Sequence, residues 1–143
     1  MRWKKIMKIS WSALFLIILL RAVVFADEGR TVMEEVHYTI SSQIDAFKKN
    51  DVKEAYTFAA PNIQAQFPNP DTFGLMVRNG YPTIWKPKNF KFVKFKDLGN
   101  KCIQRVLFQS YGGSLETYDY ILEKNNNLWK IAGVLTIRSA GET

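Results

Sequence analysis

The residues of this sequence that could carry chemistry are few and widely spaced. His37 is the only histidine and Cys102 the only cysteine, so a metal site would need scattered carboxylates as its other ligands. An isomerase-like reaction requires a carboxylate in an apolar pocket and a hydrogen-bond donor for the developing oxyanion. The nearest approximation is Asp119 as the carboxylate, with Tyr118 or Tyr120 beside it as the donor. We therefore assign no catalytic residue and expect no metal and no cofactor.

Strand alternation counts against that carboxylate. In a strand, Asp119 would face the side opposite to Tyr118 and Tyr120. His37 could act as an acid or base because imidazole titrates near neutrality, but a histidine at the margin of a helix's apolar stripe is more often half-buried and hydrogen-bonded. Cys102 is predicted to be buried, and no activating base for a reactive thiol is evident near it.

Four strands are predicted to position these residues. Runs rich in aromatic and β-branched residues at 90–96, 102–111, 115–123 and 128–137 are separated by turn signals, which predicts an antiparallel meander. In the last run, alternation predicts that one face is shared by Trp129, Ile131, Leu135 and Ile137.

The first of these runs breaks its own alternation. Phe90 and Phe92 have one parity, whereas Val93 and Phe95 have the other. A β-bulge near Phe92–Val93 would bring the aromatic residues onto one face and bend the sheet. A curved sheet that faces helices encloses a pocket, so this detail affects function.

Helices are predicted before the sheet. Apolar residues recur every three or four positions across residues 31–49, which predicts an amphipathic helix. Further helices are expected at 52–59 and 70–79, with a short turn before Pro68 and an extended crossing at 81–87. Helices followed by a meander predict an α+β fold, in which N-terminal helices pack on a curved, antiparallel four-stranded sheet.

Residues 1–26 have the layout of a secretory signal peptide. Five basic residues and no acid accompany the apolar run Trp11–Leu20, and small or modest residues precede Asp27. We expect cleavage after Ala26, a periplasmic or secreted location and one domain at 27–143. Arg21 leaves an N-terminal membrane anchor as the alternative. Without residues 1–26 the net charge falls from +7 to +2, so no nucleic-acid partner is expected.

Four segments carry a resemblance: QIDAF at 43–47, EAYTFAAP at 54–61, FGLMV at 73–77 and WKIAG at 129–133. They resemble an uncharacterised family of small secreted bacterial domains in the superfamily of nuclear transport factor two and ketosteroid isomerase. The resemblance covers roughly residues 36–137 and implies a cone-shaped α+β fold. Because that family has no established activity, the resemblance implies no reaction.

Together these observations predict a non-catalytic envelope domain that binds a small apolar ligand or an envelope protein. The candidate pocket residues are aromatic or titratable: His37, Tyr56, Phe73, Trp85, Tyr118 and Tyr120. Two alternatives stay open. One is a small isomerase- or dehydratase-like enzyme that uses the pocket, with His37 or Asp119 as base. The other is a structural homodimer joined through the outer face of the sheet.

Overall fold

Helices precede a four-stranded sheet in the computed structural model, which describes residues 30–138. The chain divides into two units, Met1–Thr31 and Val32–Thr143, and the elements described here belong to the second. The predicted signal peptide lies outside the described residues. The helices are α2 (Val32–Lys48), α3 (Val52–Thr57), α4 (Pro61–Gln66), α5 (Pro70–Gly80) and α6 (Pro82–Trp85). The strands are β1 (Asn89–Asp97), β2 (Lys101–Gln109), β3 (Leu115–Asn125) and β4 (Leu128–Ile137).

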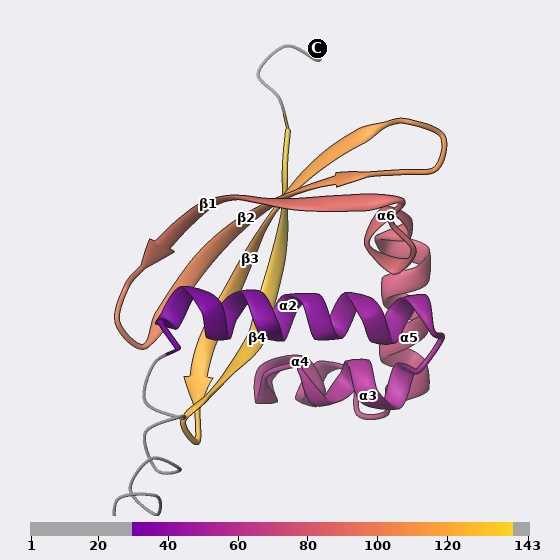
Figure 1. Cartoon of the computed structure of the whole chain (residues 1–143). Helices are drawn as coiled ribbons and strands as arrows, with labels where there is room; N and C mark the ends of the chain where they lie inside the picture. Colours follow the sequence, from indigo (N-terminus) through magenta and orange to yellow (C-terminus); the bar gives the residue numbers. More distant parts are fainter. Residues whose placement is uncertain (1–29, 139–143) are drawn as a thin grey trace, which may run out of the picture. The chain divides into compact units, whose positions relative to one another are not determined.

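The sheet is the predicted antiparallel meander, with strand order β1-β2-β3-β4 (Figure 1). Residues that pair across neighbouring strands lie on the same face of the sheet. On the inward face, Phe95 pairs with Gln104, and Gln104 pairs with Tyr120. The predicted bulge in β1 is confirmed. Phe92 pairs with Val106 and Lys94 pairs with Arg105, so Val93 has no partner in β2. The bulge keeps the phenylalanines of β1 on the inward face.

A second bulge, in β4, overturns one prediction from the sequence. Ile121 pairs with Gly133 and Leu122 with Ile131, so Ala132 has no partner in β3. An extra residue reverses the alternation beyond it. The four residues expected on one face are therefore divided between two faces. Trp129 and Ile131 face inward, whereas Leu135 and Ile137 face outward.

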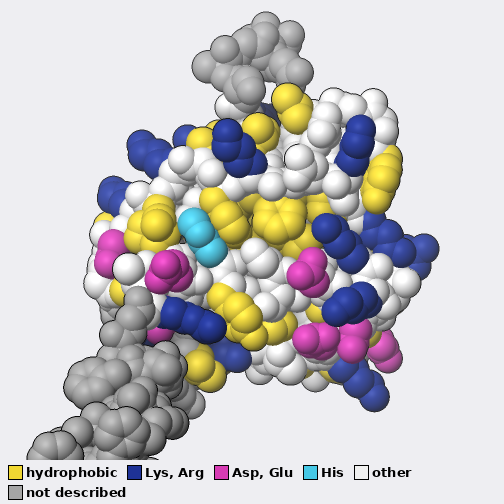
Figure 2. Space-filling model, in the orientation of Figure 1, with side chains coloured by type: hydrophobic (Ala, Val, Ile, Leu, Met, Phe, Trp, Pro, Cys, Tyr) yellow, Lys and Arg dark blue, Asp and Glu magenta, His cyan; other side chains and the backbone are white. Residues whose placement is uncertain are grey.

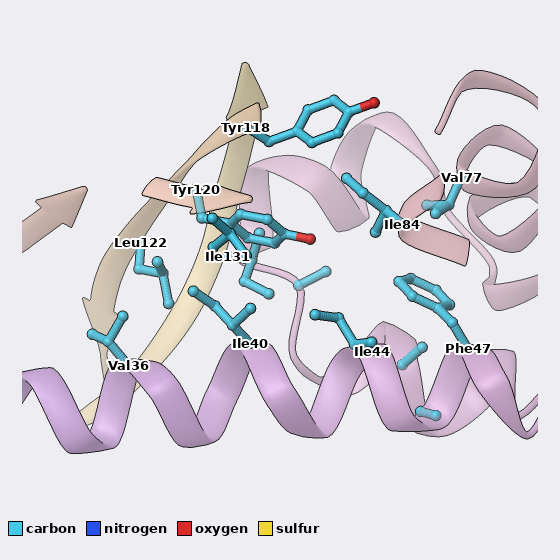
Figure 3. Close-up of a cluster of buried hydrophobic side chains, with 14 of the residues drawn as sticks. Val36, Ile40, Ile44, Phe47, Val77, Ile84, Tyr118, Tyr120, Leu122 and Ile131 are labelled. Atoms are coloured by element: carbon cyan, nitrogen blue, oxygen red, sulfur yellow. The ribbon is translucent and has the colours of Figure 1, made fainter. Parts of the chain in front are cut away.

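Helix α2 lies across the concave face of the sheet (Figure 1). Its apolar stripe includes Val36, Ile40 and Ile44, each with none of its surface exposed. Figure 3 shows this stripe pointing toward Tyr120 and Leu122 of the sheet. Fully burying one such aliphatic side chain contributes about 1.5–3 kcal/mol, so α2 is held on the sheet mainly by this stripe.

The open edge of β4 is closed by the segment between α3 and α4. The backbone N–H of Ala60 donates to the carbonyl of Ile131 at 2.8 Å, and the N–H of Ile131 donates to the carbonyl of Phe58 at 2.8 Å.

Asp51 caps the start of α3 and Asn69 caps the start of α5. Each side chain accepts a hydrogen bond from the backbone N–H three residues later. Within residues 30–138, no helix is long and apolar enough to cross a membrane.

The prediction that residues 81–87 form an extended crossing was wrong. Pro82 begins the short helix α6, in which the N–H groups of Ile84 and Trp85 both reach the carbonyl of Tyr81 at 3.0 Å. Ile84 and Trp85 are buried, and the helical turn brings both side chains into the core. Proline suits the first position of a helix because the N–H it lacks would have no partner there.

The close approach of α5 to α3 can be tested at Gly74. A Cβ atom built there would lie 2.5 Å from Cγ1 of Val52. We expect Gly74→Ala to lower the free energy of unfolding by about 1–3 kcal/mol, because the two helices would have to separate.

Gly80→Ala, in the same helix, is the matched control, because a Cβ atom at Gly80 meets no atom within 4 Å. This variant is expected to be unchanged or more stable by about 0.4–1 kcal/mol. Urea unfolding curves of the two variants and the wild type measure the difference. A Gly74→Ala variant as stable as the wild type would contradict the packing.

Candidate functional site

A cavity of about 310 Å³ lies between the helices and the concave face of the sheet. Phe47 and Ile84 contribute to its buried wall from the helices, and Tyr120 contributes from the sheet. Gln66 and Leu135, both exposed, also line it, which places an opening beside α4 and β4. The cavity is therefore enclosed on the core side and accessible from one edge.

The cavity wall is mostly apolar and, among the described residues, carries no charged side chain. Its polar side chains are those of Gln43, Gln66, Tyr81 and Tyr120. Gln43 is buried, and its amide nitrogen donates to the carbonyl of Ala55 at 3.2 Å. Burying an unpaired charge costs much more than burying an apolar group, so this wall favours uncharged molecules.

The hydroxyl of Tyr120 is the distinctive polar atom of this wall. Tyr120 has none of its surface exposed, and among the described residues its hydroxyl is the one buried side-chain oxygen or nitrogen without a hydrogen-bond partner. Figure 3 shows this hydroxyl pointing away from the sheet, toward Ile84 and Phe47. Leaving a buried hydroxyl unpaired costs about 1–3 kcal/mol.

Burial also fixes the protonation state of this hydroxyl. It raises the pKa of Tyr120 well above its ordinary value, and the nearby Tyr118 and Tyr81 raise it further. Tyr120 is therefore a protonated phenol at neutral pH, with one O–H to donate. Its ring lies in stacked contact with Phe108 at a centroid distance of 6.3 Å, which holds the hydroxyl in place.

His37 lies outside the residues that line this cavity. Its ring is stacked on Phe92, 3.8 Å between centroids, and Figure 2 shows the histidine at the surface beside hydrophobic side chains. Its Nε2 is 2.8 Å from Oε1 of Gln104. The amide nitrogen of Gln104 donates to the carbonyls of Lys94 and Arg105, so Oε1 is an acceptor and His37 Nε2 is the donor.

Two of the predicted pocket tyrosines, Tyr56 and Tyr118, use their hydroxyls in hydrogen bonds within the protein. The hydroxyl of Tyr56 donates to the carbonyl of Phe67 at 2.6 Å, which ties α3 to the end of α4. The hydroxyl of Tyr118 donates to Oε2 of Glu116 at 2.5 Å. Burial, followed by this hydrogen bond, raises the pKa of Tyr118. Neither tyrosine is among the residues that line the cavity.

The remaining predicted pocket residues divide between two places. Phe73, from α5, lines the cavity together with Tyr120. Trp85 packs against Phe47 at a centroid distance of 5.2 Å and lines a separate, more open hollow of about 440 Å³ with Asp71 and Arg78. The structure thus brings two of the six candidate residues together on one cavity wall.

The carboxylate considered for isomerase chemistry lies on the outer face of the sheet. Asp119 accepts two hydrogen bonds from Arg105, from Nε and from Nη2, each at 2.8 Å. The hydrogen bond from Arg105 lowers the pKa of Asp119.

The predicted burial of Cys102 is confirmed. Burial, followed by the charge of Asp97, raises the pKa of its thiol to about 12. Neither Asp119 nor Cys102 lines the cavity.

Several wall residues were absent from the sequence-based candidates, among them Val77, Ile84 and Ile63. Val77 follows Phe73 by four positions, so helical spacing places it on the same face of α5. That spacing indicates burial, but it does not separate the wall of a cavity from a filled core.

Comparisons with solved structures support the fold. An NTF-2 like protein of unknown function from Shewanella oneidensis MR-1 is 13% identical, with a TM-score of 0.50. The match covers 74% of this chain and 98% of that one. A second NTF2-like protein of unknown function, from Shewanella baltica OS155, is 15% identical with a TM-score of 0.51, over 78% of this chain and 100% of that one. Identities this low establish similarity of fold alone.

Comparison with protein families gives a match over most of the chain. No curated protein matches the sequence. The family model described as "Domain of unknown function (DUF4864)" matches residues 30–143. That range contains every helix and strand of the described fold. The chain therefore belongs to the DUF4864 family of domains of unknown function, and its fold is of the nuclear transport factor two-like type.

Proposed function

We propose that this protein is a non-catalytic domain of the cell envelope that binds a small, uncharged and largely apolar molecule in the cavity between the helices and the sheet. The observation that carries this proposal is the cavity itself, about 310 Å³ with a mostly apolar wall. Ligand pockets are commonly 300–1,000 Å³ and predominantly apolar, with a few polar groups that orient the ligand. This cavity lies at the lower end of that range, which suits a molecule of one or two rings.

The positions of the candidate bases support binding rather than chemistry. An isomerase- or dehydratase-like mechanism would use His37 or Asp119 on a molecule held in the pocket. His37 is bound to Gln104 outside the cavity wall, and Asp119 is paired with Arg105 on the opposite face of the sheet. Either residue would have to leave its partner and cross the sheet or helix layer to reach a bound molecule.

The proposed envelope location rests on the sequence of residues 1–26. Their basic start, short apolar run and small-residue exit are typical of a signal that directs export. An apolar ligand would then be taken from the periplasm or the extracellular space.

A homodimer is the second candidate, and the outer face of the sheet favours it. This face carries half-buried Ile103, Leu107 and Ile121, and exposed Leu135. Exposed apolar patches on sheets often mark contacts between proteins. Sedimentation at twice the chain mass, lost in Leu107→Lys, is the result expected for a dimer, because Leu107 lies on this face and does not line the cavity. A wild-type monomer at every concentration would remove this candidate.

Filling the cavity should abolish ligand binding. We expect tetralin, a bicyclic hydrocarbon, to bind the wild type and to bind Val77→Phe at least tenfold more weakly, because the added ring occupies the cavity. Ligand-observed NMR measures both affinities. Ile63→Trp fills the cavity from α4 and serves as a second variant if Val77→Phe does not fold.

Leu75→Phe provides the matched control in the same helix. Leu75 is 58% exposed and does not line the cavity, so its enlargement should leave tetralin binding unchanged. Equal binding by the cavity-filled variants and the wild type would show that tetralin binds elsewhere and would contradict the proposed site.

Export predicts a specific mature mass. Protein recovered from the envelope of its own cells should have an intact mass that corresponds to a chain starting at Asp27. Mass spectrometry under denaturing conditions measures this directly. A mass that includes residues 1–26 would instead favour the membrane-anchored alternative, and recovery in the cytoplasmic fraction would contradict export.

A further inference from the structure

We propose that the Tyr120 hydroxyl selects the ligand by donating a hydrogen bond to an acceptor atom that enters the cavity. This inference rests on the proposed function and specifies the ligand further: a small molecule, largely apolar, whose buried polar atom is a carbonyl, ether or ester oxygen. In the sequence, Tyr120 is a candidate pocket residue and a possible donor beside Asp119, and nothing in the pattern indicates an unpaired hydroxyl.

The unpaired hydroxyl stands out because its neighbour is fully satisfied. Gln104 and Tyr120 face each other across β2 and β3 on the inward side of the sheet. The side chain of Gln104, 1% exposed, donates to two backbone carbonyls and accepts from His37. The Tyr120 hydroxyl, equally buried, has no partner among the described residues. Buried polar groups normally have partners, so the exception requires an explanation.

The position of the hydroxyl points to a ligand as that explanation. Tyr120 lines the cavity together with Phe47 and Ile84, the two residues toward which Figure 3 shows its hydroxyl directed. The ring is fully shielded from solvent and stacks on Phe108, so the hydroxyl is oriented before a ligand binds. A fixed donor in an apolar wall favours a ligand that presents one acceptor at that point.

The unsatisfied group is a donor, which sets the chemistry of the ligand atom. The phenol stays protonated, and its O–H has no acceptor within residues 30–138. A ligand that offers only donors would leave that O–H unpaired, whereas a carbonyl or ether oxygen would pair with it. The nearby Tyr118 does not compete for the ligand, because its hydroxyl is bound to Glu116.

A matched pair of probes isolates the hydrogen bond. Tetralin and α-tetralone share a bicyclic skeleton, and the ketone adds one acceptor oxygen. We expect Tyr120→Phe to bind α-tetralone about tenfold more weakly than the wild type, and tetralin within about twofold of the wild type. Each ligand is compared between the two proteins, so the different hydration of the ligands cancels. Titration calorimetry or ligand-observed NMR gives the affinities.

Tyr56→Phe is the control for the loss of a tyrosine hydroxyl. Tyr56 does not line the cavity, and its hydroxyl is bonded within the protein. We expect Tyr56→Phe to melt at a lower temperature than the wild type and to keep the full preference for α-tetralone. Without ligand, Tyr120→Phe should melt at or above the wild-type temperature, because it loses an unpaired polar group.

The outcomes separate this inference from the proposed function. Equal loss of both probes in Tyr120→Phe, or no loss of either, would overturn the role of the hydroxyl while the cavity remained a ligand site. A lower melting temperature for Tyr120→Phe would show that the hydroxyl has a structural partner and would also overturn it. Binding of neither probe to the wild type would overturn the proposed function and this inference with it.

Discussion

The buried amide of Gln104 holds both the bend of the sheet and helix α2. Its nitrogen donates to the carbonyls of Lys94 and Arg105, next to the bulge at Val93, and its oxygen accepts from His37 of α2. A bulge increases the local twist and bend of a sheet. Because every polar atom of this amide is paired, the strand, the bulge and the helix are fixed relative to one another. The curvature that makes room for the cavity depends on this network.

The two faces of the sheet have different environments, since one packs against the helices and the other faces away from them. Inward, the stripe of α2 packs on β3 and β4, and the cavity opens where α4, α5 and α6 complete the wall. Outward, Arg105 and Asp119 form an ion pair, and the neighbouring cross-strand pair on the same face is apolar, Ile103 with Ile121. On the inward face, the hydroxyl of Tyr120 is the one buried side-chain polar atom of the described residues without a hydrogen-bond partner. Binding would offset the cost of burying that atom.

The sequence predicted helices followed by a four-stranded meander, but not α6. It predicted the first bulge because aromatic parity in β1 changes visibly between Phe92 and Val93. It did not predict the bulge at Ala132, since both faces of β4 carry apolar residues and a change of face leaves little trace in the pattern. Of the candidate pocket residues, Tyr118 and Tyr120 are equivalent by strand parity. Only the three-dimensional structure separates them, because the hydroxyl of Tyr118 donates to Glu116, whereas that of Tyr120 has no partner in the part of the chain that the structure describes.

If the cavity is a ligand site rather than a packing defect, the protein should carry a molecule when it is purified gently from the cells that make it. A native mass spectrum should then give the mass of the chain plus one small, non-covalent adduct for the wild type. It should give the mass of the chain alone for Val77→Phe, whose added ring occupies the cavity. The mass of the bare chain for the wild type, or the same adduct on both proteins, would contradict the ligand site.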